Sequence, residues 1–412
     1  MRVDPEERSL VRELAKRVAE IAALPIQAER IRLWKDLNAL HPQRAMVLLN
    51  PQNGWVDLVP DTALACQHER LRGIELGLRR ALVRHSLIHD DYPIVADYGV
   101  SWIIHRSDYG IRETYTHTEA RSVFHWDPPI KTAADMDKLQ SRTLTVDRAA
   151  SADDLAFVQE LLGDILNVHR SGINHCRCGL TRQLVMLRGL DQMMLDMYDE
   201  PALLHDLISF LRDEQLREFA FYERENLLAL NNGPQDWTGS GGLATTDALP
   251  AEGHDPEHIR LDDMYAWGES QETVGVGPRQ FDEFVLQYQL PIVNQFGLVD
   301  YGCCEPLDCK LDLIIESIPR LRWLAVSTWA DRERAAEKLG RRYVYCYKPQ
   351  PSAMCQPTPD WEGAEQELRE TLEITRGCCV SLVMKDTTSY FGEPERATRW
   401  TDIAQRVAAE MA

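Results

Sequence analysis

The sequence predicts an α/β protein built as a (β/α)8 barrel, the TIM-barrel architecture, with an N-terminal helical extension. Short apolar or β-branched runs recur along the chain, and amphipathic helix-like stretches separate most of them. Strands that alternate with helices indicate parallel βαβ units, and eight runs match the strand number of a closed barrel. The length of 412 residues suits one such domain with additions. The eight runs are residues 44–49, 94–100, 165–170, 227–232, 297–304, 321–327, 343–348 and 379–385.

The N-terminal extension is predicted to cover residues 1–43. Charged and apolar residues alternate with helical spacing over 6–23 and again over 26–40, so both stretches are expected to be helices. The run RAMVLL at 44–49 is the first expected strand, and the turn-rich residues NPQNGW follow it. The barrel domain would therefore span 44–412.

Further helices are expected between the later strands, over 190–226, 278–296 and 363–376. The stretch 233–262 is rich in Gly, Pro and Asp and is too long for a simple connection, so it is interpreted as a loop over the carboxyl ends of the strands. Its glycine-rich part, GSGGL at 239–243, is expected to act as a flexible lid, because it lacks the Lys-Ser/Thr of a phosphate-binding loop.

Composition excludes several classes of partner. The 45 Lys and Arg residues face 65 Asp and Glu residues, which gives a formal net charge of −20. Nucleic acids and anionic membranes bind clustered cations, so neither is an expected partner. No apolar run reaches the roughly 18–20 residues that cross a bilayer, and the charged N-terminus does not resemble a signal peptide. A cytoplasmic protein is expected, whose 10 cysteines are thiols or metal ligands.

Candidate binding residues follow the predicted strands. In a (β/α)8 barrel the reactive groups project from the carboxyl ends of the strands, so the side chains directly after each run are the ones to consider. These side chains are polar, aromatic and rich in sulfur. The expected substrate-binding residues are Asn50, Trp102, His105, Asn231, Trp267, Gln271 and Trp329.

The adjacent residues Cys303 and Cys304 form the most distinctive pattern. Neighbouring side chains on a strand point to opposite faces, so at most one of the two would look into a given pocket. Thiolates and a carboxylate suit zinc, which makes Cys303, Cys304 and Glu269 candidate metal ligands, with Asp386 as a further carboxylate. The alternative is that the pair is small, buried and inert.

Two further groups carry alternative interpretations. Lys385 and Asp386 follow the last run, where they would serve as an acid–base pair or as a structural salt bridge. The motif HCRC at 175–178 places Cys176 and Cys178 two residues apart, beside His175, which resembles half of a metal site. No second motif of this kind completes it.

Five longer motifs, in their order and spacing, make the chain similar to the uroporphyrinogen decarboxylase superfamily, and in particular to its corrinoid-dependent methyltransferase branch. The resemblance covers most of residues 40–410 and implies a (β/α)8 barrel with its site at the C-terminal mouth. The motifs are RCGLTRQLVMLRGLDQMMLDMYDEPALLHDLISFL at 177–211, FDEFVLQYQLPIVNQFG at 281–297, YGCCEPLD at 301–308, VSTWADRERAAEKLG at 326–340 and MKDTTSYFGEPERATRW at 384–400.

The resemblance implies a cobalamin (corrinoid)-dependent methyltransferase or demethylase component. It would move a methyl group between a small O- or N-methyl compound and a corrinoid on a separate protein. The related enzymes hold zinc through a His-x-Cys motif and a later Cys, whereas here Tyr301 stands where the His would pair with Cys303, and no Cys occurs around Asp386. Zinc, or an acid such as Lys385 or Tyr301, would polarise the methyl-bearing atom.

Two alternatives remain from the sequence. One is a cofactor-independent decarboxylase or related lyase, with Asp386 or Glu269 as the acid and His105 as a substrate-binding residue. The region after the first strand offers Asn50 and Gln52 in place of the arginines that the resemblance implies for binding porphyrinogen carboxylates, which disfavours that substrate. The other is a non-enzymatic binder of a tetrapyrrole. The oligomeric state is open, with a homodimer as one option.

Overall fold

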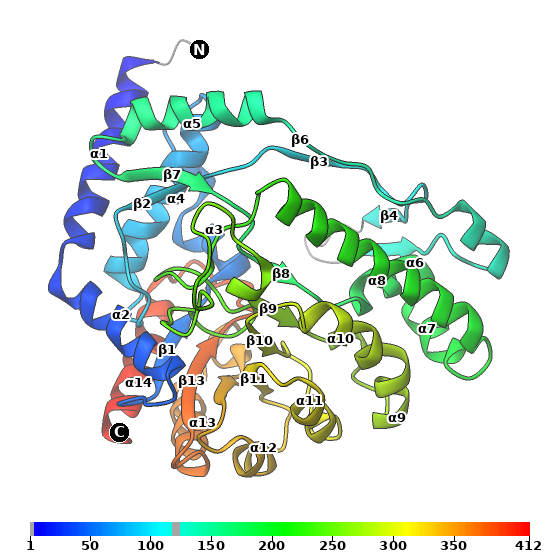
Figure 1. Cartoon of the computed structure of the whole chain (residues 1–412). Helices are drawn as coiled ribbons and strands as arrows, with labels where there is room; N and C mark the ends of the chain where they lie inside the picture. The colour runs from blue at the N-terminus through cyan, green and yellow to red at the C-terminus, as the bar shows by residue number, and fades with distance from the viewer. Residues whose placement is uncertain (1–3, 118–123) are drawn as a thin grey trace.

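A seven-stranded, all-parallel sheet forms the centre of the computed structural model, which describes residues 4–117 and 124–412. The strand order is β1-β13-β12-β11-β10-β9-β8 (Figure 1). Every neighbouring pair in this sheet is parallel, so the carboxyl ends of all seven strands meet at one edge. The strands are β1 Met46–Leu49, β8 Cys176–Arg177, β9 Tyr265–Gly268, β10 Leu298–Tyr301, β11 Leu321–Ser327, β12 Val344–Lys348 and β13 Cys379–Met384.

Helices cover the outside of this sheet, where α11, α12 and α13 follow β10, β11 and β12 (Figure 1). The expected N-terminal helices at 6–23 and 26–40 are confirmed as α1 and α2. The helices are α1 Pro5–Ala22, α2 Pro25–Asn38, α3 Trp55–Leu58, α4 Glu69–Leu87, α5 Arg148–Leu162, α6 Thr181–Arg188, α7 Leu190–Asp196, α8 Pro201–Arg224, α9 Pro278–Phe281, α10 Gln287–Val293, α11 Leu311–Ser317, α12 Arg332–Leu339, α13 Trp361–Ile374 and α14 Glu395–Glu410.

The sequence accounts for these elements locally. All residues of β12 and β13 are buried, as expected for parallel strands that are covered on both faces. Helix α14 buries Trp400, Ala404 and Val407, whose spacing of three and four residues places them on one face. Helix α1 starts where the Asp4 carboxylate accepts a hydrogen bond from the backbone N–H of Glu6 at 2.7 Å.

A second group of strands lies outside the main sheet. Strand β2 (Asp97–Ser101) pairs in parallel with β7 (Asn167–Ser171) and packs with α1, α4 and α5 around a separate apolar cluster. Two antiparallel pairs lie between β2 and β7 in the sequence. They join β3 (Ile104–Arg106) to β6 (Leu144–Val146) and β4 (Thr114–His117) to β5 (Phe124–Asp127).

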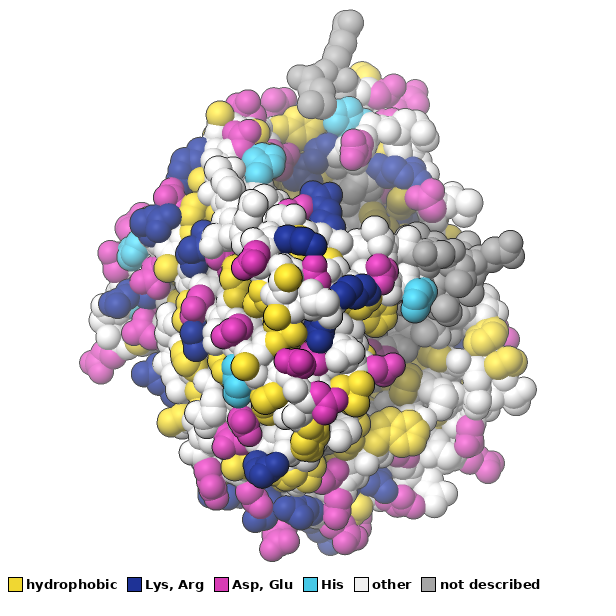
Figure 2. All heavy atoms as spheres, turned by 90° about the vertical axis from the view of Figure 1, so that its right-hand side faces the viewer, with side chains coloured by type: hydrophobic (Ala, Val, Ile, Leu, Met, Phe, Trp, Pro, Cys, Tyr) yellow, Lys and Arg dark blue, Asp and Glu magenta, His cyan; other side chains and the backbone are white. Residues whose placement is uncertain are grey.

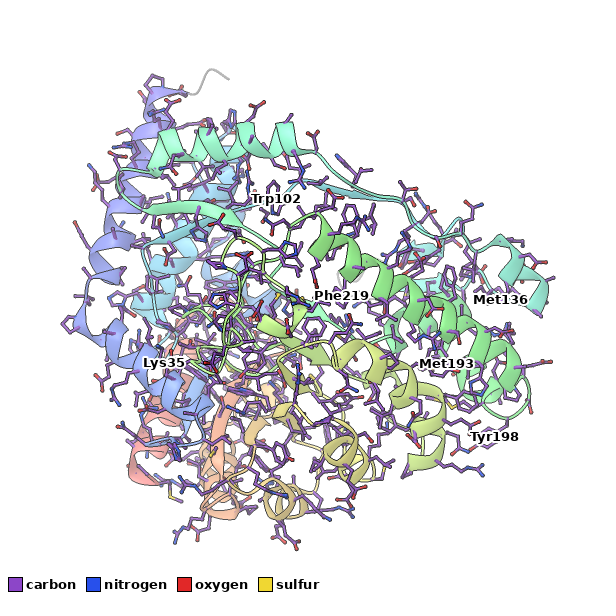
Figure 3. The ribbon with its side chains drawn as sticks, viewed as in Figure 1. Lys35, Trp102, Met136, Met193, Tyr198 and Phe219 are labelled. Atoms are coloured by element: carbon purple, nitrogen blue, oxygen red, sulfur yellow. The ribbon has the colours of Figure 1, made fainter. Side chains whose placement is uncertain are left out.

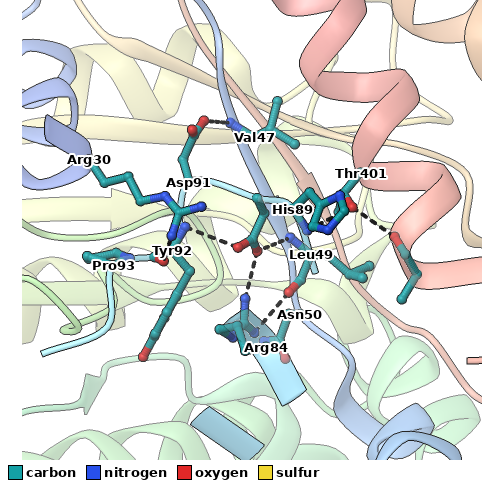
Figure 4. A network of polar contacts seen from close by, with 12 residues as sticks. Arg30, Val47, Leu49, Asn50, Arg84, His89, Asp91, Tyr92, Pro93 and Thr401 are labelled. Carbon is teal, nitrogen blue, oxygen red and sulfur yellow. Dashed lines mark hydrogen bonds and ion pairs between the residues drawn. The ribbon is translucent and has the colours of Figure 1, made fainter. Parts of the chain in front are cut away.

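The edge of β1 is occupied by residues 88–93 (Figure 4). The backbone N–H of Asp91 donates to the carbonyl of Val47 at 2.9 Å, and the Asp91 carboxylate accepts from the Val47 N–H at 2.8 Å. The Asp90 carboxylate accepts from the Leu49 N–H at 3.0 Å and from Arg84 at 2.6 Å. These bonds satisfy backbone groups that a neighbouring strand would otherwise pair.

The predicted α/β class with a parallel sheet is confirmed, but the predicted strands are distributed differently. The runs at 44–49, 297–304, 321–327, 343–348 and 379–385 supply strands of the main sheet. Those at 94–100 and 165–170 become the separate pair β2 and β7. The run 227–232 forms only a bridge from Leu228 to Ile173. The main sheet instead contains β8 and β9, two strands that lie outside the predicted runs. Closure into a barrel stays a prediction.

The surface mixes charges of both signs. On the face shown in Figure 2, acidic and basic side chains are interspersed with small apolar areas. Among the described residues, every helix is too short or too polar to cross a bilayer.

Candidate functional site

A cavity of about 420 Å³ opens where the strands β1, β9 and β13 end, and we call it the mouth cavity. Its position agrees with the general rule that parallel α/β proteins bind ligands at the carboxyl ends of their strands. Three of the residues expected from the sequence line it, namely Asn50, Trp267 and Lys385. The full lining is Asn50, Gln52, Asn174, His175, Gln235, Asp236, Trp237, Gly239, Ser240, Trp267, Val383 and Lys385.

A cluster of polar side chains lies behind this lining, centred on Cys303. The Lys385 ammonium is 3.3 Å from the Cys303 sulfur, and the Ser240 hydroxyl is 3.4 Å from the same atom. Lys385 also donates to the Ser240 Oγ at 2.8 Å. Cys303 itself is buried, so Lys385 and Ser240 are the members of this cluster that face the cavity.

The glycine-rich segment 239–243 brings Ser240 to this position. A side chain at Gly239 would place its Cβ 2.3 Å from the Trp267 ring, and one at Gly242 would place it 2.6 Å from the Trp323 ring. Only glycine allows the backbone to pack this closely. The segment is therefore buried against the strand ends and does not lie over them as the flexible lid that its composition suggested.

Charges around Cys303 favour its thiolate form. Hydrogen bonding from the Cys304 thiol lowers the pKa of Cys303, and Lys385, Ser240 and Lys348 lower it further, against the opposing effect of burial. Burial alone would lower the pKa of Lys385, but the charges of the Cys303 thiolate and of Asp386 outweigh it and raise that pKa above its usual value. The result is a thiolate–ammonium pair at the edge of the cavity.

Cys304 is the protonated member of the adjacent pair. Its sulfur lies 3.7 Å from the Cys303 sulfur and 2.7 Å from Oδ2 of Asp386. The contact with Cys303, burial and the Asp386 carboxylate all raise the pKa of Cys304. Asp386 is exposed and has a φ of 59°, a left-handed conformation that aspartate tolerates better than most residues. Cys303, Cys304, Lys385 and Asp386 are thus brought together, whereas Glu269, which the sequence grouped with the two cysteines, is not.

Two buried acids, Asp300 and Glu305, lie next to this cluster. Burial raises the pKa of Asp300 to about 6 and that of Glu305 to about 7. Asp300 accepts hydrogen bonds from Thr238 at 2.8 Å and from the Gly241 N–H at 3.0 Å. Glu305 accepts from the backbone N–H of Cys303 at 2.8 Å, which fixes the turn that carries the thiol. Both acids lie near a strand end, which is the only sequence signal for them.

Glu269 and Tyr301 lie away from the mouth cavity. Glu269 is buried and forms an ion pair with Arg177 at 2.6 Å. Tyr301 is fully buried, and its hydroxyl donates to Gln289 at 2.7 Å. Neither is among the residues that line the cavity. A tyrosine in this position supports the packing of β10 against α10.

The other expected binding residues are dispersed. Trp102 lies near α5 and β7 (Figure 3), where the guanidiniums of Arg148 and Arg170 pack over its ring. His105 is exposed on β3, and Trp329 is 71% exposed. The remaining two are Asn231, which is buried and hydrogen-bonded to the backbone of Tyr265, and Gln271, which is exposed.

The arrangement does not fit a zinc site. Glu269 is bound by Arg177, and the ammonium of Lys385 lies beside Cys303, where its charge would oppose a metal cation. Within residues 4–117 and 124–412, no group of three or more His, Cys, Asp or Glu side chains has a geometry that could hold a metal ion. His175, Cys176 and Cys178 form no such group either, and both of these thiols are buried among apolar residues.

A second cavity of about 390 Å³ adjoins the mouth cavity, because Asn174 and His175 line both. We call it the arginine cavity, since its lining includes Arg106, Arg142 and Arg177. Phe219 on α8, labelled in Figure 3, forms part of its wall.

Comparisons of the chain with models of known protein families and with curated proteins found no match.

Proposed function

We propose that the protein is a methyltransferase or demethylase component that binds a small O- or N-methyl compound in the mouth cavity. The observation that carries this proposal is the Lys385 ammonium on the cavity wall, 3.3 Å from the Cys303 sulfur. A methyl group leaves an oxygen or nitrogen atom more easily when an acid stabilises the negative charge that develops on that atom. The resemblance of the sequence to corrinoid-dependent methyltransferases supports the same reaction class.

In this proposal Lys385 is the acid, and Cys303 is its positioning partner. A buried ammonium is costly without a counter-charge. The Cys303 thiolate supplies this charge, while Ser240 accepts a hydrogen bond from Lys385 at 2.8 Å and fixes its direction. Lys385 would donate its proton to the heteroatom that loses the methyl group. Asn50 and Trp267, which also line the cavity, would contact the rest of the compound.

The methyl acceptor implied by the resemblance is a corrinoid on a separate protein. Small-molecule pockets have volumes of roughly 300–1,000 Å³. The mouth cavity, at about 420 Å³, suits a small methyl compound and is too small to enclose a corrin ring. A corrinoid would therefore remain on its carrier, outside the cavity. We further propose that residues 88–93, which occupy the edge of β1, complete a (β/α)8-like barrel that follows the helical extension 1–43.

The test uses the purified full chain with cob(I)alamin and a panel of O-methyl and N-methyl compounds. Consumption of cob(I)alamin is followed by its absorption spectrum, and the demethylated product is identified by mass spectrometry. We expect one compound class to react, and we expect Lys385→Met to lower the rate at least about 100-fold. The control Arg334→Gln removes a cation from a surface ion pair with Asp312 and should leave the rate unchanged. Equal rates in Lys385→Met and wild type would contradict the proposal.

A carboxy-lyase is the second candidate, because Arg106, Arg142 and Arg177 next to the mouth cavity are residues that bind carboxylates. The same assay distinguishes it. A lyase would release CO2 from a carboxylate compound without consuming cob(I)alamin.

A further inference from the structure

We propose that the arginine cavity binds the anionic group, a carboxylate or a phosphate, of the substrate whose other end lies in the mouth cavity. The substrate would then be a methylated carboxylic acid or phosphate ester. This inference depends on the proposed function only for the reaction at the methyl end, because anion binding can be measured without turnover.

The local charge supports an anionic ligand. The lining of the arginine cavity contains three guanidiniums and one carboxylate, that of Glu218. Even when the buried Glu269 behind Arg177 is included, three positive charges face two negative ones. The chain as a whole carries −20, so this local excess of positive charge is unusual for the molecule. Arginine is also well suited to carboxylate and phosphate groups, because it donates two parallel hydrogen bonds.

The guanidiniums are held in place before a ligand arrives. Arg106 contacts Oε1 of Glu218 at 3.2 Å, while Arg142 donates to the other oxygen of the same carboxylate. Arg177 is fixed by two hydrogen bonds to Glu269, at 2.6 and 3.1 Å, and packs over the Trp267 ring. Fixed donors lose little side-chain entropy when they bind a ligand.

One donor in the cavity lining has no acceptor. The Nε of Arg142 is buried and forms no hydrogen bond with any residue that the structure describes. A buried N–H of this kind costs about 1–3 kcal/mol when it stays unpaired. A bound carboxylate or phosphate would accept hydrogen bonds from the guanidinium N–H groups of Arg106, Arg142 and Arg177 that Glu218 and Glu269 do not engage.

The two cavities adjoin at two shared lining residues, Asn174 and His175. In the proposed complex, a molecule with its anionic group beside the arginines extends past these two residues toward Lys385. Burial and the charge of Arg177 lower the pKa of His175, which favours its neutral ring and leaves the positive charge of the cavity on the arginines. Asn174 is oriented by its hydrogen bond to Asp236 at 2.8 Å.

The experiment measures binding of two probes, succinate and inorganic phosphate, to the full chain by isothermal titration calorimetry at low ionic strength. We expect at least one of them to bind wild type, with an affinity that falls as salt is added. Arg106→Gln should weaken binding about tenfold or more, while the matched control Arg334→Gln should not change it. Whichever probe binds more tightly identifies the anionic group as carboxylate or phosphate.

A second variant tests whether a loss of binding comes from the loss of arginine geometry or from unfolding of the protein. Arg142→Lys keeps the positive charge and removes the forked geometry, so it should weaken binding several-fold with little change in melting temperature. Lys385→Met should retain anion binding even though it loses turnover, which separates this inference from the proposed reaction. Absence of binding for both probes, or equal binding in wild type and Arg106→Gln, would overturn the inference.

Discussion

Replacing Lys385 with methionine should raise the pKa of the Cys303 thiol. The ammonium lies 3.3 Å from the sulfur. At that separation and an effective dielectric constant of about 20, the attraction between two unit charges is roughly 5 kcal/mol. One pKa unit corresponds to about 1.4 kcal/mol, so the upper limit of the shift is between three and four units, roughly. Because Lys348 and Ser240 remain near the thiolate, we expect a rise of about two units.

The assay is a site-resolved pH titration. Protein labelled with 13C at the cysteine Cβ gives a chemical shift that follows the ionisation of each thiol, and Cys303→Ser assigns the signal of Cys303. Methionine has a length similar to that of lysine, so packing next to Ser240 is retained. A Cys303 pKa that stays within about half a unit of the wild-type value in Lys385→Met would refute the reasoning.

Three further substitutions test other parts of the structure. Burial raises the pKa of Glu305 to about 7, so the folded state binds more protons than the unfolded state between about pH 4.5 and 7. The contribution of Glu305 to the free energy of unfolding should therefore fall by about 3 kcal/mol as the pH rises through this range, and urea titrations of Glu305→Gln should show a loss smaller than that of wild type by about this amount. Gly242→Ala would place a Cβ 2.6 Å from the Trp323 ring and should cost about 1–3 kcal/mol of unfolding free energy by urea titration. Arg84→Met leaves the buried Asp90 carboxylate unpaired and should cost about 3–5 kcal/mol in the same assay, whereas an unchanged midpoint would show that the pair is dispensable.

Apolar runs in the sequence predicted the second half of the fold well. Strands β10–β13 are almost entirely buried, and their sequences are mostly apolar or β-branched. Strand β8 has two residues and no such run, so periodicity cannot detect it. The run at 94–100 does form a strand, but residues 88–93 occupy the edge of β1 and leave β2 to pair with β7. The pairing of residues 88–93 with β1 depends on the carboxylates of Asp90 and Asp91, which no periodic pattern in the sequence reveals.

The sequence predicted those residues of the candidate site that lie just after the ends of strands. Lys385 and Cys303 directly follow β13 and the end of β10, so the rule for parallel sheets placed them together. Ser240 and Asp236 come from the irregular segment 233–262, whose path follows from the close packing of its glycines against buried aromatic rings. Glu269 also follows a strand, but its ion pair with Arg177 turns it away from the thiols. Strand position therefore predicts which residues reach the edge of the sheet, and local charge decides where they point.

Thiolate absorbance in the near ultraviolet at pH 7 is the most direct measurement of the central claim, which is that Cys303 is ionised and paired with Lys385 beside the mouth cavity. Comparing wild type with Cys303→Ser, we expect the variant to lose the signal of one thiolate, while Cys304→Ser retains it. If wild type and Cys303→Ser had the same absorbance at pH 7, Cys303 would be a neutral thiol and the proposed role of the pair would be wrong.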